Sequence, residues 1–129
     1  MLKEFLICII IITGIVVGNL ITQNYSVRSI EDINNQLREL KGTMQNEETN
    51  EEEIHSKVEK IDKQWNDKFS KLAYYIEHDE LEKFAKNLEG IKIYAELKDY
   101  ENAMKEINEG IFILEHIEYK YSFNLQNIF

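Results

Sequence analysis

An apolar run near the N-terminus constrains this chain more than any other feature. Residues Phe5–Ile21 (FLICIIIITGIVVGNLI) contain no charged side chain. Counted from Leu2, the segment forms about 30 Å of helix at about 1.5 Å per residue, which is enough to cross the core of a bilayer. We therefore predict a transmembrane anchor at residues 1–22. A cleaved signal peptide is the alternative, but the small-x-small site that cleavage needs is matched poorly by Val16-Val17-Gly18.

The charges that flank this run bear on its orientation. Lys3 and the α-amino group lie on one side, and Arg28 is the first basic residue on the other. This gives little positive-inside bias. Because the N-terminal flank is short, we expect a single-pass protein of the cell membrane with its N-terminus inside and its acidic C-terminal part outside.

Two glycines of the anchor, Gly14 and Gly18, stand one helical turn apart. A small-xxx-small pair on one helix face lets a second membrane helix approach closely. The alternative is that glycine is simply frequent in membrane helices.

Composition excludes several classes of protein. The chain has 15 Lys and Arg against 24 Asp and Glu, a net charge of −9, which argues against a nucleic-acid partner. A single cysteine allows no internal disulfide. The absence of proline, together with abundant Glu, Lys, Leu and Ile, indicates a helical chain.

Residues beyond the anchor divide into three segments. Ile30, Ile33, Leu37 and Leu40 recur at heptad spacing and predict a stalk helix at residues 23–41, under two heptads of coiled coil. An acidic, polar joint follows at residues 42–50, beginning at Gly42. Residues 51–129 are predicted to form a helical module with an apolar tail.

Cap residues and apolar periodicity place three helices in this module. Asn50, with Glu53 three residues later, predicts the start of a helix to about Glu77. Asp79 (with Glu82) and Asp99 predict the next two starts, and such short turns imply antiparallel neighbours. The predicted fold class is all-α: a transmembrane helix, a stalk helix and an antiparallel three-helix bundle or hairpin module.

A short echo, Glu89-Gly90-Ile91 and Glu109-Gly110-Ile111, lies on two of these helices. Glycine inside a helix costs about 1 kcal/mol relative to alanine, so we expect close helix contact there. The tail residues Phe123, Leu125, Ile128 and Phe129 are expected to cover an open edge of the bundle or, alternatively, to dock on a membrane or partner.

Residues capable of catalysis or metal binding show no convincing pattern. Glu52-x-x-His55 is half of a di-metal bundle motif, and neither His78 nor His116 supplies the other half. Phosphate loops and nucleophile motifs do not occur. We therefore expect no enzyme activity, no metal and no cofactor.

Several runs in the second half of the chain are similar to those of a known family. They are Trp65, residues 72–82 (LAYYIEHDELE), Asp99 with Ala103, residues 111–117 (IFILEHI) and residues 127–129 (NIF). These runs resemble the domain of unknown function 4363 family, small membrane-anchored helical proteins of low-GC Gram-positive bacteria. The resemblance implies a location and a fold but transfers no activity, partner or site residue.

The leading functional hypothesis is a non-enzymatic accessory module that binds another integral membrane protein or a second copy of itself. A second is a ligand-binding bundle with a cavity lined by Trp65, Tyr74, Tyr75 and Tyr94. A third is an envelope scaffold that associates through a coiled coil at Ile30–Leu40.

Overall fold

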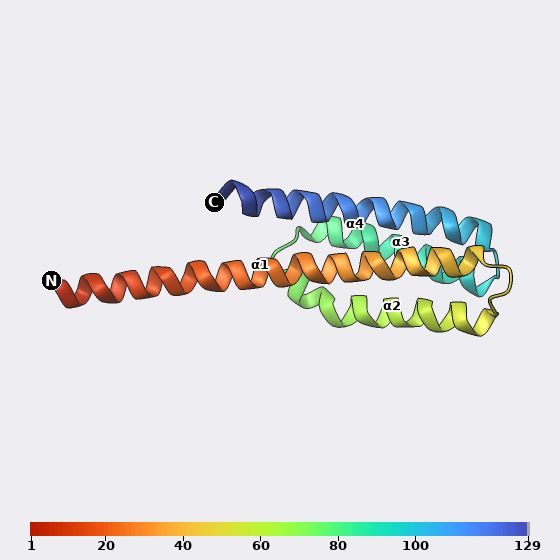
Figure 1. Cartoon of the computed structure of the whole chain (residues 1–129), viewed down its shortest axis with the longest axis horizontal. Helices are drawn as coiled ribbons and strands as arrows, with labels where there is room; N and C mark the ends of the chain where they lie inside the picture. Colours follow the sequence, from red (N-terminus) through yellow and green to blue (C-terminus); the bar gives the residue numbers. More distant parts are fainter. Residues whose placement is uncertain (129) are drawn as a thin grey trace.

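The chain folds into four α-helices, as a computed structural model shows for the backbone of residues 1–128 and the side chains of residues 1–121 (Figure 1). The helices are α1 (Leu2–Gln45), α2 (Glu51–Leu72), α3 (His78–Glu96) and α4 (Tyr100–Ile128). No strand occurs within the described residues. The predicted all-α class is confirmed.

The anchor and the expected stalk form one continuous helix. The 44 residues of α1 run without a break from Leu2 through Gly42 to Gln45, beyond the joint expected at residue 42. The N-terminal part of α1 projects from the bundle, whereas the C-terminal part lies within it (Figure 1). The stalk segment is therefore a full member of the bundle, which has four helices.

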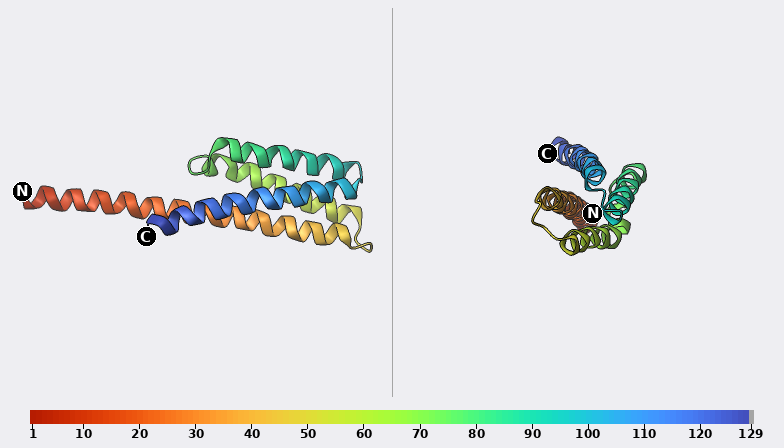
Figure 2. Two further views of the ribbon diagram at one scale, coloured as in Figure 1. Left: turned by 90° about the horizontal axis from the view of Figure 1, so that it is seen from above. Right: turned by 90° about the vertical axis from the view of Figure 1, so that its right-hand side faces the viewer.

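The four helices run alternately up and down. α1 packs against α2 and α4, and α3 packs against the same two helices from the opposite side (Figure 2). The turn between α2 and α3 and the C-terminal end of α4 lie at the end of the bundle from which α1 projects. We call this the near end, and the opposite end, with the α1–α2 and α3–α4 turns, the far end.

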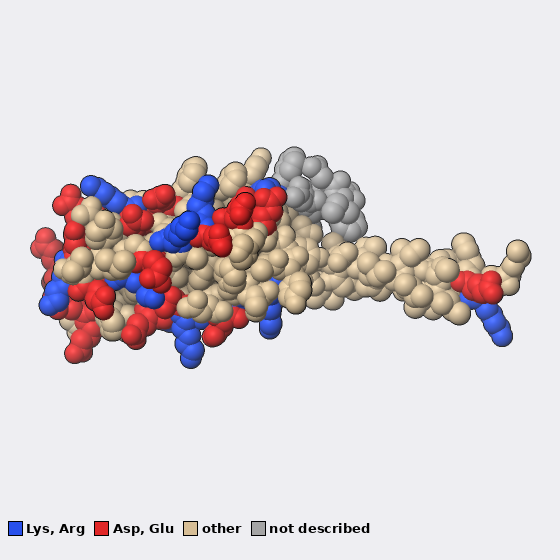
Figure 3. All heavy atoms as spheres, turned by 180° about the vertical axis from the view of Figure 1, so that it is seen from behind, with Lys and Arg blue, Asp and Glu red and all other residues tan. Residues whose placement is uncertain are grey.

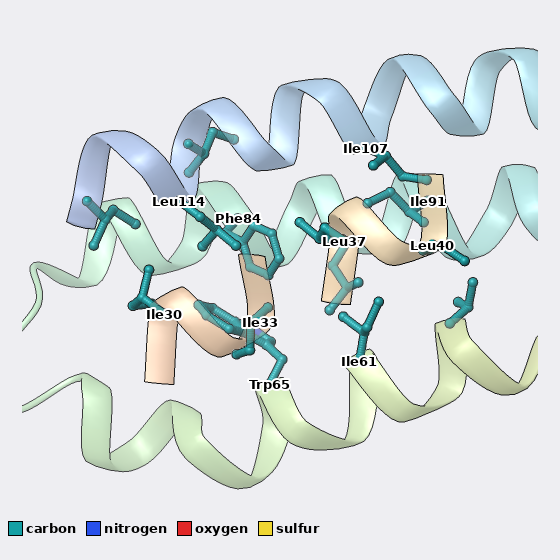
Figure 4. Packing of buried hydrophobic residues seen from close by; sticks show 14 of the residues in the cluster. Ile30, Ile33, Leu37, Leu40, Ile61, Trp65, Phe84, Ile91, Ile107 and Leu114 are labelled. Atoms are coloured by element: carbon teal, nitrogen blue, oxygen red, sulfur yellow. The ribbon is translucent and has the colours of Figure 1, made fainter. Parts of the chain in front are cut away.

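The core explains why the stalk segment joins the bundle. Its heptad residues Ile30, Ile33, Leu37 and Leu40 are fully buried and face the other three helices (Figure 4). Trp65 of α2 meets Phe84 of α3 edge to face, with ring centroids 4.6 Å apart. An apolar stripe too short for a sustained coiled coil is thus covered by intramolecular packing.

Two of the three predicted helix caps are confirmed. The Asn50 side chain accepts a hydrogen bond from the Glu53 backbone N–H at 2.8 Å. Asp99 accepts one from the Asn102 backbone N–H at 3.3 Å, after Lys98 has turned the chain with a φ of 60°. The prediction for Asp79 is wrong: α3 begins earlier, with Glu77 at the N-cap and no side-chain cap.

The boundary of α2 also differs from its prediction. The helix ends at Leu72, and the chain then tightens, with the Tyr74 and Tyr75 backbone N–H groups bonded to carbonyls three residues back. Ile76 is nevertheless buried, so the apolar periodicity continues past the end of the helix. This is why sequence spacing extended α2 to Glu77.

Candidate interaction surfaces

The projecting half of α1 presents an uncovered apolar surface. One stretch of α1 is long and apolar enough to span a membrane, and none of that stretch is buried in the bundle. The projecting segment carries charge only near its tip, where Lys3 and Glu4 lie, whereas acidic and basic side chains are spread over the bundle (Figure 3).

The Gly14–Gly18 face lies within this uncovered stretch. A Cβ built on either glycine meets nothing within 4 Å. Among the described side chains, therefore, none packs against either glycine, and this face can accept another helix. The free cysteine, Cys8, is exposed on the same segment.

Contacts at the near end tie α1 to the turn and to α4. The Tyr75 hydroxyl donates to the Asn19 carbonyl oxygen at 2.9 Å. Gln23 Nε2 donates to the Tyr121 carbonyl oxygen at 2.9 Å, and the Glu77 backbone N–H donates to the Tyr121 hydroxyl at 2.9 Å. The bundle therefore begins at Asn19, inside the segment predicted as the anchor.

The predicted tail residues lie outside the described side chains. The backbone of α4 continues as a helix to Ile128. Phe123, Leu125 and Ile128 are on this stretch, for which only the backbone is described, and Phe129 lies beyond the described residues. Their predicted covering or docking role stays a prediction.

The aromatic residues proposed to line a ligand cavity do not come together. Trp65 is buried in the core, whereas Tyr74 is exposed over 86% of its surface. The hollow next to Trp65 holds about 230 Å³ and includes none of Tyr74, Tyr75 and Tyr94. These four side chains therefore do not form the predicted cavity.

A larger groove, about 540 Å³, lies between α2 and α3 at the far end. Ion pairs join charges along its walls: Lys92 to Asp62 at 3.1 Å, and Lys98 to Glu51 at 3.0 Å. The hydrogen bonds that Lys92 donates to Asp62 and then to Glu89 raise the pKa of Lys92. The groove is open, charged and internally paired, which is typical of a solvated helix–helix boundary.

Carboxylates gather where α1 meets α4. Partial burial is the main cause that raises the pKa of Glu118, and the neighbouring Glu31 and Glu115 raise it further. Arg38 pairs with Glu115 and opposes this shift.

The histidines are dispersed: His55 and His78 pair with Glu59 and Glu82 on their own helices, both at 3.0 Å. The residues with described positions include no group of three or more metal-ligating side chains.

Comparison with known families identifies the chain. The family described as Domain of unknown function (DUF4363) matches residues 20–128. The chain belongs to the DUF4363 family. No curated protein and no solved structure gives a significant match.

The DUF4363 match begins where the bundle begins. Its first residue, residue 20, follows Asn19, the point at which the near-end turn contacts α1. The match includes the segment predicted as a stalk, in agreement with the burial of Ile33 and Leu37. The family domain is therefore the four-helix bundle, and most of the projecting helix precedes it.

Sequence reasoning missed the polar part of the α1 packing face. Gln23, Ser26 and Ser29 are buried at the near end, and Asn34 is buried further along. Gln23 and Ser26 continue the spacing of Ile30 and Ile33 by alternating steps of three and four. If polar residues had been accepted at heptad positions, the sequence would have predicted that the buried face of this helix extends back to Gln23.

Proposed function

We propose that this DUF4363 protein is a single-pass membrane protein whose bundle serves as a non-enzymatic accessory module for another integral membrane protein. The observation that carries the proposal is the continuity of α1, which joins an uncovered apolar half to a half buried in the core. A partner bound to the first half would thereby position the bundle without an intervening flexible joint.

The Gly14–Gly18 face supports a bilayer helix as the partner. Small residues let two backbones approach closely, and membrane helices associate mainly through packing and hydrogen bonds rather than burial from water. Because the described side chains of the bundle leave both glycines uncovered, we expect bulky substitutions there to affect association in the membrane without disturbing the fold.

Two rival functions have less support. A scaffold that self-associates through Ile30–Leu40 would have to open the bundle, because all four heptad side chains are fully buried. A ligand-binding bundle would need an aromatic cavity, and Trp65 and Tyr74 point to different environments, one buried and one exposed. We propose the orientation with the N-terminus in the cytoplasm and the bundle outside the cell membrane.

Photo-crosslinking in intact membranes, followed by mass spectrometry, tests the proposal. The crosslinker replaces Ile11 or Ile15, which are exposed residues beside the glycine face. We expect one integral membrane protein to be captured, and expect its yield to fall when Gly14→Leu and Gly18→Leu are combined. The matched control combines Ile12→Leu and Val16→Leu, which lie on the opposite face of the helix.

The outcomes separate the hypotheses. Equal loss of the partner in both double variants would contradict a role for the glycine face. Capture of only a second copy of this chain would replace the accessory role with self-association. Release of the protein from membranes by alkaline carbonate would contradict the anchor itself.

A further inference from the structure

The anchor is too short to hold the bundle clear of the membrane. The charged residues Lys3 and Glu4 mark one edge of the apolar segment. From Phe5 to Asn19 the helix advances only about 21 Å at about 1.5 Å per residue, whereas the hydrocarbon core of a bilayer is about 30 Å thick. Tilting the helix would shorten its projection and make the shortfall larger.

The α2–α3 turn is attached to α1 at Asn19, within the length of helix that the bilayer core would cover. The Tyr75 hydroxyl lies 2.9 Å from the Asn19 carbonyl oxygen and 3.2 Å from its side-chain oxygen. The turn is also held from α4, because Tyr121 accepts the Glu77 backbone N–H. A bilayer that covers the apolar part of α1 must therefore reach the turn.

The side chains at the turn suit the boundary between water and lipid. Tyrosine combines an apolar ring with a polar hydroxyl and is enriched at membrane interfaces. Tyr74 is 86% exposed beside the bonded Tyr75. Lys71, in the last turn of α2, places its Nζ 5.8 Å from the ring centroid of Tyr25 on α1, and its long side chain can reach the headgroups from there.

The charges near the turn limit how deeply it can enter. Lys120 pairs with Glu80 at 3.3 Å and with Glu77 at 3.6 Å, which reduces repulsion from anionic lipids. Asp79 remains exposed at the start of α3. Because an exposed carboxylate is costly in hydrocarbon, the headgroup layer is the depth that fits.

The backbone of α4 extends in the same direction. Its C-terminal end lies nearer to the N-terminus of α1 than the α2–α3 turn does (Figures 1 and 2). Lys120 is its last charged residue, and residues 121–129 (YSFNLQNIF) carry no charged side chain. A second element of the near end is thus free of charged side chains where it approaches the predicted bilayer.

We propose that the near end of the bundle is a lipid-contacting surface, with Tyr74 and Tyr75 immersed in the headgroup layer of the bilayer that α1 spans. This inference rests on the proposed anchor. The bundle would then be held at a fixed height on the membrane by the turn as well as by α1.

Electron paramagnetic resonance of the full chain in vesicles of phosphatidylethanolamine and phosphatidylglycerol tests the depth of the turn. A nitroxide label is attached at Tyr74→Cys in a Cys8→Ser background. Collisions with oxygen, which concentrates in lipid, are compared with those of a water-soluble nickel chelate. Parallel labels at Ile10→Cys and at Glu47→Cys report the anchor and the far end.

We expect the ratio of oxygen to nickel collisions at Tyr74 to lie between a high value at Ile10 and a low value at Glu47. A ratio at Tyr74 equal to that at Glu47, with Ile10 still in lipid, would overturn the immersion of the near end and leave the anchor intact. Water-like ratios at all three positions would overturn the anchor as well. A label at Ala73→Cys, also exposed in the turn, guards against local disturbance by the first variant.

Discussion

The two mid-helix glycines illustrate how differently one residue type can act within a bundle. Gly110 is buried, and a Cβ there would lie 2.4 Å from Asn87 Oδ1 and 3.3 Å from Leu37 Cδ1. Asn87 is itself fixed by hydrogen bonds from Nδ2 to the Glu106 carbonyl oxygen at 2.8 Å and carboxylate at 3.0 Å. The atoms nearest to a Cβ on Gly90 would be those of the Glu106 side chain, the closest at 3.2 Å. The predicted close helix contact is confirmed at Gly110, where the neighbour is the short, buried side chain of Asn87.

Alanine at these two positions should have opposite effects on stability. Gly90→Ala should stabilise the bundle by up to about 1 kcal/mol, the gain in helix propensity, because only a small shift at the end of the Glu106 side chain is needed and Asn87 keeps its bond to the Glu106 carbonyl oxygen. Gly110→Ala should destabilise it, since overpacking costs about 1–3 kcal/mol and exceeds that gain. Urea unfolding in detergent micelles, followed by fluorescence of the single, buried Trp65, measures both. Stabilisation by Gly110→Ala would show that Asn87 yields easily.

A pH-dependent penalty is expected at Glu118. Its folded-state pKa is raised by burial and by Glu31 and Glu115, so folding disfavours the ionised carboxylate. The contribution of Glu118 to the free energy of unfolding therefore falls as pH rises from the ordinary pKa of about 4.5 through the raised pKa. Glu118→Gln should stabilise the bundle at pH 7, and this advantage should vanish below the ordinary value.

Unfolding midpoints at pH 7 and pH 4 test this expectation. Glu109→Gln, at an exposed position of the same helix, serves as the control and should change the midpoint little at either pH. A destabilising effect of Glu118→Gln at pH 7 would mean that the carboxylate makes a favourable contact that outweighs its burial.

The local sequence predicted the helix caps at Asn50 and Asp99 correctly and the cap at Asp79 wrongly, and the structure shows why. Asn50 and Asp99 are followed by regular helix, so their side chains reach the expected backbone N–H groups. Asp79 fails because the chain is already helical one residue before it, after a turn held by Tyr121 from α4. That long-range contact leaves no trace in the local pattern.

At the scale of elements, α1 is the helix for which the structure differs most from the prediction, because the expected stalk is part of the bundle. Hydrophobic spacing alone placed Ile30, Ile33, Leu37 and Leu40 on one face but could not say what covers them. A stalk, a coiled coil and a bundle helix share the same pattern. The covering residues come from α2, α3 and α4, and burial of all four side chains decides for the bundle.

Shortening a buried heptad side chain of α1 should therefore destabilise the whole bundle. Leu37→Ala removes a fully buried side chain and should cost about 2–5 kcal/mol of unfolding free energy. Asn35→Ala, at an exposed position two residues away, should change it by less than about 0.5 kcal/mol. Chemical denaturation monitored by Trp65 fluorescence distinguishes them. A neutral Leu37→Ala would contradict the membership of this segment in the core.

At the scale of the whole molecule, one continuous helix links the predicted membrane span to the DUF4363 bundle. The sequence predicted the span from its lack of charge and the bundle from its periodicity. It did not predict that the two overlap at Asn19, because the side chains that join them there are polar. Gln23 and Tyr121 make the next such contact.

Pulsed electron resonance between nitroxides on Cys8 and on Asn35→Cys tests this continuity most directly. The full chain is reconstituted in vesicles, which places one label in the span and the other on the bundle. An unbroken helix predicts a narrow distance distribution centred near about 40 Å, from 27 residues at about 1.5 Å each. A broad distribution shifted to shorter distances would show a flexible joint between span and bundle, and would contradict the account.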